Sequence, residues 1–230
     1  MNFAIIVAAG SGTRFGSTVP KQFHEILGKP LLIHTLERFE FCPAVDEIIL
    51  VLSAEEIENF QNIAVRFNLK KLSVIVSGGE TRAASVLNGL NSIASEAAEI
   101  VAVHDGARPL VTIEEIALTI ETARDAGAAC LVAPVTDTIK EIADGKIVGT
   151  IDRAKLRRAL TPQCFRYEIL RRAFTENEIS ETVTDECSLV EKLGYEIAAV
   201  EGSAKNVKVT TPEDFILAET LLRHLETENV

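Results

Sequence analysis

The chain has 230 residues, of which 23 are lysine or arginine and 34 are aspartate or glutamate, so its formal net charge is −11. This balance disfavours a nucleic-acid partner, because proteins that follow a phosphate backbone are usually basic. Hydrophobic residues make up 47% and charged residues 25% of the chain, which is an ordinary globular composition and excludes a disordered or low-complexity protein.

Short apolar runs alternate with amphipathic segments along the chain. The apolar runs predict buried strands at Asn2–Ala9, Glu47–Leu52, Leu72–Val76, Ile100–Val103, Ala128–Ala133 and Ile197–Val200. The amphipathic segments predict helices at Pro30–Phe41, Ser53–Arg66, Thr81–Ala94, Thr112–Ala126 and Pro212–Leu225, with Ser53 opening a capping box. This alternation predicts an α/β fold with a mostly parallel sheet, in a single domain over residues 1–230.

Residues from about 136 to 160 interrupt the alternation. Two short polar strands, Thr138–Ile142 and Lys146–Ile151, flank Asp144-Gly145, a dipeptide typical of a hairpin turn. Because such a hairpin cannot bury both faces alone, we expect a β-arm that protrudes from the sheet and packs on a second subunit. A surface flap on a monomer is the alternative.

A glycine-rich loop follows the first strand. Gly10-Ser11-Gly12-Thr13-Arg14-Phe15-Gly16 holds three glycines, which let backbone N–H groups approach a phosphate closely. Phe15 stands where the dinucleotide fingerprint requires glycine, and the lysine of a P-loop is also missing, so neither named phosphate loop is present. Arg14 and Lys21 supply positive charge suited to a triphosphate. The loop therefore predicts a phosphate site beyond the carboxyl end of the first strand.

Six further motifs follow the loop and its Pro20-Lys21-Gln22 in chain order: Gly78–Val86, His104–Pro109, Thr136–Lys140, Leu160–Gln163, Thr184–Glu186 and Asn206–Thr210. From Ala4 to about Ala218 the chain resembles the 2-C-methyl-D-erythritol 4-phosphate cytidylyltransferase family of the non-mevalonate isoprenoid pathway. The resemblance implies a Rossmann-like three-layer nucleotidyltransferase fold. It also implies transfer of the cytidylyl group of CTP to 2-C-methyl-D-erythritol 4-phosphate, giving 4-diphosphocytidyl-2-C-methyl-D-erythritol and pyrophosphate.

The resemblance also implies roles for individual residues. Those with catalytic roles are Arg14, Lys21, Arg153 and Lys208. Those that bind the nucleotide are Ala8, Ala9, Gly10, Gly12, Gly79, Arg82, Ser85 and Asp105. Those on the side of the polyol phosphate are Arg108, Thr136, Thr161 and Thr184. Mg²⁺ is the implied cofactor and Asp105 its candidate ligand, since Mg²⁺ prefers oxygen ligands; Arg153 lies in the arm, which in the family crosses into the partner of a homodimer.

Some neighbouring residues carry further expectations. Thr184 either contacts polyol hydroxyls or caps the next helix. His104 is expected to be structural. The family usually has alanine at Gly106, so we expect a slightly looser loop there. The arginines expected on solvated helix faces are Arg157, Arg158, Arg171 and Arg172.

Alternative functions remain open at this point. A ribitol 5-phosphate cytidylyltransferase shares the loop and most motifs, although Ala8-Ala9-Gly10 and Ala107-Arg108-Pro109 favour the methylerythritol family. A non-catalytic nucleotide-binding module could dispense with the four residues given catalytic roles, and all four are present. An NAD-dependent oxidoreductase is disfavoured by the missing fingerprint.

The cysteines and apolar runs bear on location. Cys42, Cys130, Cys164 and Cys187 show no CxxC or zinc spacing, which fits free thiols in a reducing compartment. No apolar run reaches the roughly 20 residues that span a bilayer, and no export signal is evident. We therefore expect a cytoplasmic protein without a membrane partner.

Overall fold

The computed structural model describes residues 1–10, 15–16, 19–180 and 183–228. Its strands are β1 (Asn2–Val7), β2 (Glu25–Ile26), β3 (Lys29–Pro30), β4 (Glu47–Leu52), β5 (Leu72–Ser77), β6 (Ile100–Asp105), β7 (Ala128–Pro134), β8 (Ile139–Ala143), β9 (Lys146–Ile151), β10 (Arg157–Arg166) and β11 (Ala198–Glu201). Its α-helices are α1 (Leu31–Glu40), α2 (Ile57–Ala64), α3 (Arg82–Asn91), α4 (Ile113–Ala126), α5 (Tyr167–Glu176), α6 (Glu186–Lys192) and α7 (Pro212–Glu228).

Seven of the described strands form one sheet, in the order β11-β7-β10-β6-β1-β4-β5. All neighbours run parallel except those of β10, which is antiparallel to both β6 and β7. β1 lies between β6 and β4, with Ile5 opposite Val103 on one side and Ile49 on the other. The α/β class with a mostly parallel sheet is therefore confirmed.

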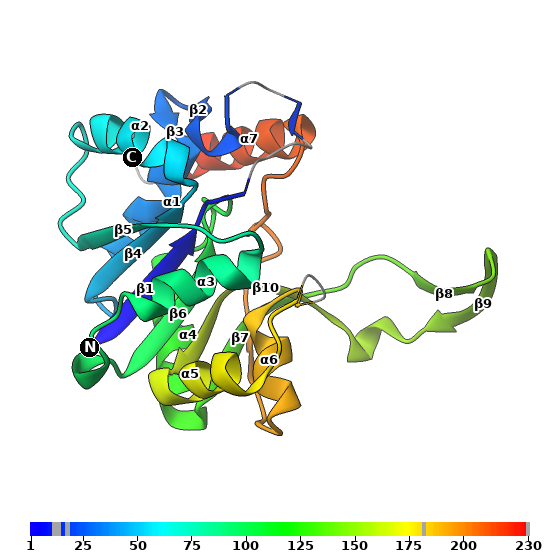
Figure 1. Cartoon of the computed structure of the whole chain (residues 1–230). Helices are drawn as coiled ribbons and strands as arrows, with labels where there is room; N and C mark the ends of the chain where they lie inside the picture. The colour runs from blue at the N-terminus through cyan, green and yellow to red at the C-terminus, as the bar shows by residue number, and fades with distance from the viewer. Residues whose placement is uncertain (11–14, 17–18, 181–182, 229–230) are drawn as a thin grey trace.

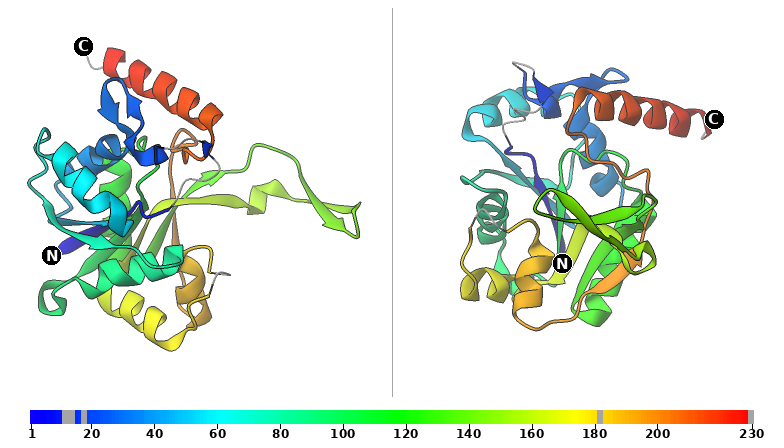
Figure 2. Two further views of the ribbon diagram at one scale, coloured as in Figure 1. Left: turned by 45° about the horizontal axis from the view of Figure 1, so that its top comes forward. Right: turned by 90° about the vertical axis from the view of Figure 1, so that its right-hand side faces the viewer.

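Helices cover both faces of this sheet and make three layers (Figures 1 and 2). Successive residues of a strand point to opposite faces, and β1 shows the consequence. Ala4 and Ile6 pack in a cluster with buried residues of α1, α2 and α4. Phe3 and Ile5 pack in a second cluster with buried residues of α3, α5 and α6. The near-continuous apolar run of β1 thus follows from burial on both faces.

A smaller apolar cluster lies under α7, which Figure 1 shows beside β2 and β3. Ala218 and Leu222 of α7 pack there with Ile26, Leu110 and Val209. Val209 belongs to the segment that leads into α7, and its N–H donates to the carbonyl of Ala107 at 2.8 Å. The cluster therefore holds the chain around Lys208 close to the loop that follows β6.

The predicted arm is present as the hairpin of β8 and β9, which extends away from the sheet (Figures 1 and 2). Asp144 and Gly145 at its turn have φ of 48° and 73°, and positive φ at both central residues is what a type I′ turn requires. Three large apolar side chains on the hairpin are mostly exposed: Ile142 at 59%, Ile147 at 65% and Val148 at 58%. A single chain leaves this apolar surface uncovered.

The sequence-based boundary of the arm was too wide at its second end. Residues 157–160 begin β10 of the main sheet, so Arg157 and Arg158 lie on a strand and not on a helix face. The exposed start of this strand is polar, whereas residues 160–165 are buried. Because the strand begins with polar residues, the sequence pattern assigned its first residues to the arm and not to a strand of the core. Arg171 and Arg172 do lie on a helix, α5.

The predicted capping box at Ser53 is also wrong. A short 3-10 helix, Ala54–Glu56, precedes α2, and the Ser53 side chain makes no capping hydrogen bond. Within the described part of the chain, no helix combines the length and apolar character needed to cross a membrane.

Candidate active site

The carboxyl ends of β1 and β6, with the start of α3, surround a cavity of about 500 Å³. This volume is in the usual range for small-ligand sites. Eight of the predicted site residues line it: Ala8, Ala9, Gly10, Lys21, Arg82, Ser85, Asp105 and Lys208. A position outside the carboxyl ends of parallel strands is where ligands bind in open α/β sheets.

Two glycines allow the loop after β1 to lie against its neighbours. A Cβ on Gly78 would come within 2.4 Å of the Cβ of Ala9. A Cβ on Gly106 would come within 2.9 Å of the Cβ of Ala8 and 3.0 Å of Leu32 Cδ1. These positions are therefore closely packed, and the slightly looser loop expected at Gly106 stays a prediction. The fit sets the backbone of Ala8 and Ala9 at the wall of the cavity.

The turn before α3 is held by two hydroxyl groups. Thr81 caps the helix, its Oγ1 accepting from the N–H of Ala84 at 3.0 Å. Ser85 is buried; its hydroxyl accepts from the N–H of Gly79 at 3.1 Å and donates to the carbonyl of Thr81 at 2.9 Å. These bonds place Arg82, the first residue of α3, at the cavity wall, where the helix N-terminus adds partial positive charge.

Asp105, the last residue of β6, forms ion pairs with three cationic side chains. Arg82 Nε lies 3.1 Å from its Oδ1, whereas Arg108 Nε and Lys208 Nζ lie 3.2 and 3.0 Å from its Oδ2. Burial by itself raises the pKa of Asp105, but Arg82, Lys208 and Arg108 outweigh burial and hold that pKa well below its usual range. The carboxylate therefore stays ionised across the physiological range.

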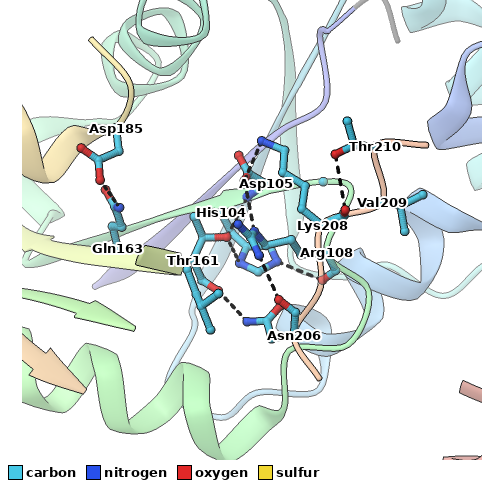
Figure 3. A network of polar contacts seen from close by, with 12 residues as sticks. His104, Asp105, Arg108, Thr161, Gln163, Asp185, Asn206, Lys208, Val209 and Thr210 are labelled. Carbon is cyan, nitrogen blue, oxygen red and sulfur yellow. Dashed lines mark hydrogen bonds and ion pairs between the residues drawn. The ribbon is translucent and has the colours of Figure 1, made fainter. Parts of the chain in front are cut away.

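His104 takes part in a chain of hydrogen bonds beneath the site (Figure 3). The N–H of Asp105 donates to Thr161 Oγ1 at 3.2 Å, and Thr161 Oγ1 and His104 Nδ1 are 2.9 Å apart. His104 Nε2 is 3.2 Å from the carbonyl of Arg108. A carbonyl only accepts, so Nε2 carries the proton and Nδ1 accepts from the threonine hydroxyl. Burial lowers the pKa of His104 to about 3, and this neutral ring fits the structural role expected of it.

The segment before α7 is tied to the site by three contacts. Arg108 Nη1 donates to the carbonyl of Asn206 at 2.9 Å, and Asn206 Nδ2 donates to the carbonyl of Thr161 at 2.9 Å (Figure 3). Lys21 Nζ donates to the carbonyl of Val209 at 2.7 Å. Lys21 and Lys208, 187 positions apart in the sequence, thereby line the same cavity.

Other predicted site residues lie away from the cavity or outside the described part. Arg14 and Gly12 fall outside the described residues. Arg153 and Thr136 are both exposed at the base of the arm, where Arg153 Nη1 donates to the carbonyl of Thr136. Neither of them lines the cavity. A single chain thus does not bring them to Lys208.

The structure corrects the interpretation of Thr184 as a helix cap. The cap of α6 is Asp185, whose Oδ1 accepts from the N–H of Ser188 at 3.0 Å. Thr184 precedes the cap and is exposed, so its capping interpretation is wrong. A contact of Thr184 with polyol hydroxyls stays a prediction.

Three buried polar residues have contacts that sequence reasoning missed. Glu186 Oε1 accepts from Arg82 Nη1 at 2.7 Å, and Gln163 Oε1 accepts from the N–H of Glu186 at 3.1 Å. Asn206 is the third. All three lie inside motifs that the sequence displays, yet the only signal was their motif membership, because the burial of a polar side chain depends on tertiary packing.

The family follows from comparison with known proteins. The family model described as "IspD: 2-C-methyl-D-erythritol 4-phosphate cytidylyltransferase" matches residues 2–224. A 2-C-methyl-D-erythritol 4-phosphate cytidylyltransferase of Alkaliphilus metalliredigens is 45% identical over 221 residues, covering 95% of this chain and 91% of the relative. A bifunctional enzyme IspD/IspF of Desulfotalea psychrophila is 43% identical over 219 residues, and the match covers 95% of this chain but 56% of that longer relative.

A solved structure agrees with these sequence matches. The 4-diphosphocytidyl-2C-methyl-D-erythritol synthase of Anaerococcus prevotii aligns with a TM-score of 0.83 at 30% identity, covering 96% of each chain. The match extends along nearly the whole chain and thus includes the sheet and the strand ends that form the cavity. The chain belongs to the 2-C-methyl-D-erythritol 4-phosphate cytidylyltransferase family and is a cytidylyltransferase.

Proposed function

We propose that the cavity at the ends of β1 and β6 binds CTP and is the place where its cytidylyl group passes to 2-C-methyl-D-erythritol 4-phosphate. The observation that carries this assignment is the gathering of Lys21, Arg82 and Lys208 at one cavity of a chain whose net charge is −11. Concentrated positive charge beside backbone N–H groups suits a triphosphate.

The reaction needs no covalent enzyme intermediate. A phosphate oxygen of the polyol phosphate attacks the α-phosphorus of CTP in line, the bond from that phosphorus to the bridging oxygen of the β-phosphate breaks, and pyrophosphate leaves. The attacking oxygen is already ionised, so a general base adds little, which agrees with the neutral, buried ring of His104. Catalysis is then positioning plus neutralisation of phosphate charge by Lys21, Lys208 and, by family resemblance, Arg14.

Mg²⁺ is the proposed cofactor, with Asp105 as the candidate protein ligand. The described lining of the cavity holds two carboxylates, Asp105 and Glu80. No group of three or more acidic, histidine or cysteine side chains placed to hold a metal occurs among the described residues. This donor set fits an ion held mainly by phosphate oxygens and water, as Mg²⁺ commonly is. When bound, the ion would neutralise charge on the triphosphate.

We also propose a homodimer in which the arm of one protomer packs on the other. Exposed Ile142, Ile147 and Val148 supply an apolar surface for that contact. Arg153 and Thr136, at the base of the arm, then complete the polyol phosphate site of the partner, with that partner's own copy of Lys208. The four cysteines are free and buried, which supports a reducing, cytoplasmic setting.

Pyrophosphate release tests the assignment. With CTP and Mg²⁺, we expect release with 2-C-methyl-D-erythritol 4-phosphate and none with ribitol 5-phosphate, because the family model and the named relatives are methylerythritol phosphate enzymes. Release with ribitol 5-phosphate alone would keep the chemistry and change the substrate. A folded protein that binds CTP and releases no pyrophosphate with either would be a non-catalytic module.

A further inference from the structure

Arg82 bridges two carboxylates that come from different parts of the chain. Its Nε lies 3.1 Å from Asp105 Oδ1, and its Nη1 lies 2.7 Å from Glu186 Oε1. Asp105 also forms ion pairs with Arg108 and Lys208. Among the described residues, Glu186 has its ion pair with Arg82 alone. The orientation of this guanidinium therefore depends more on Glu186 than on the shared Asp105.

The burial of Glu186 is unusual for a carboxylate. Its side chain is fully buried, and its Oε2 has no hydrogen-bond partner among the described residues. A buried charge costs stability unless it is paired, and even a paired one is often no better for stability than an apolar side chain. A contribution to folding stability therefore does not explain why a carboxylate is present at this position. A role in orienting the Arg82 side chain does explain it.

The backbone beneath Glu186 is fixed by Gln163 of β10. Gln163 Oε1 accepts from the N–H groups of both Glu186 and Cys187 at 3.1 Å. Gln163 Nε2 donates to Asp185 Oδ2 at 2.9 Å, the contact drawn in Figure 3. Gln163 is itself buried. This arrangement sets the start of α6 relative to the sheet, and with it the direction from which Glu186 meets Arg82.

We propose that Glu186 is a positioning residue that holds the Arg82 guanidinium at the cavity wall in the orientation that CTP needs. Arg82 is the first residue of α3 and lines the cavity, whereas Glu186 does not. Without Glu186 the guanidinium turns to Asp105, where Arg108 and Lys208 already lie, and its orientation toward the nucleotide is lost. The inference rests on the proposed contact between Arg82 and CTP.

A double-mutant cycle tests the proposal, with the dissociation constant of CTP measured by calorimetry for wild type, E186A, R82A and R82A/E186A. If Glu186 acts through Arg82, E186A weakens CTP binding by about tenfold in the wild-type background, the usual scale for a hydrogen bond to a charged group. The double variant then binds CTP within about twofold of R82A alone. In steady state, E186A raises KM for CTP and leaves KM for the polyol phosphate unchanged.

The other outcomes separate the two claims. Equal loss from E186A in both backgrounds, or none in wild type, overturns the positioning role. If R82A binds CTP normally, the contact between Arg82 and CTP fails as well. E186L nearly keeps the side-chain volume and removes both acceptor oxygens, so the same cycle with it decides the question if E186A does not fold. E176Q is the matched control, because Glu176 pairs with Arg172 at 2.6 Å on the exposed face of α5, and it should leave CTP binding unchanged.

Discussion

At the scale of single residues, the site is organised around one carboxylate. Asp105 balances part of the positive charge of Arg82, Arg108 and Lys208, which would otherwise repel one another at the cavity wall. Lys208 is the least buried of the three, with 38% of its side chain exposed. It is therefore the cation best placed to leave Asp105 for a phosphate oxygen.

Replacing Asp105 by asparagine should separate charge balance from nucleotide binding. D105N removes one negative charge among three cations, so CTP affinity without Mg²⁺ should not weaken. Turnover should fall by about 100-fold or more, the scale found when a group that stabilises transition-state charge is lost. Calorimetry without metal and pyrophosphate release with Mg²⁺ measure the two effects. Near wild-type turnover would remove Asp105 from the metal site. D125N, on the exposed side of α4, is the control.

The sequence indicated part of this arrangement. A carboxylate that ends a buried parallel strand must lie at the carboxyl edge of the sheet, so the place of Asp105 was predictable. Its contacts were not, because Arg82 and Lys208 come from α3 and from the segment before α7. Burial of Glu186 and Asn206 could not be anticipated either, since it results from packing between elements distant in the sequence.

At the scale of elements, β10 is the strand whose absence from the sequence-based prediction matters most, because its side chains hold two parts of the site. It runs antiparallel between β6 and β7. Thr161 on this strand holds the N–H of Asp105, and Gln163 holds the N–H of Glu186. One strand therefore sets both carboxylates that meet Arg82. The parallel strands were predictable because each is a run of apolar residues. β10 was not, because it begins with two exposed arginines and its apolar, buried residues come only in its second half.

The close approach of elements makes a second substitution informative. In G78A the added Cβ would lie 2.4 Å from Ala9 Cβ and 2.9 Å from Ser85 Oγ. The loop after β1 must then shift, and we expect a loss of about 1–3 kcal/mol in the free energy of unfolding together with weaker CTP binding. Denaturant unfolding and calorimetry measure these. In the control G149A, the nearest atom to the added Cβ is the flexible end of Glu141 at 3.4 Å. Unchanged stability of G78A would contradict the packing argument.

At the scale of the whole molecule, the arm decides whether one chain is a complete enzyme. The hairpin extends away from the body (Figure 2). Arg153 lies at its base, where it donates to the carbonyl of Thr136, whereas Lys208 lines the cavity. The hairpin was predictable because its turn has a strong local signal. The sequence also predicts that the hairpin packs on a second subunit, and this stays a prediction, because exposed apolar residues do not by themselves identify the partner that covers them.

Mixing two inactive variants tests whether the site spans two protomers. If Arg153 serves the partner's cavity, R153A and K208A each lose turnover, and a mixed dimer regains one site. That site combines Lys208 of the R153A protomer with Arg153 of the K208A protomer. Random pairing of equal amounts makes half of the dimers mixed, so recovery should approach about a quarter of wild-type activity. Each variant mixed with itself should stay inactive. Absence of recovery, with mixed dimers confirmed by native mass spectrometry, would mean that Arg153 acts within its own chain or not at all, because a site confined to one chain is defective in both protomers of the mixed dimer.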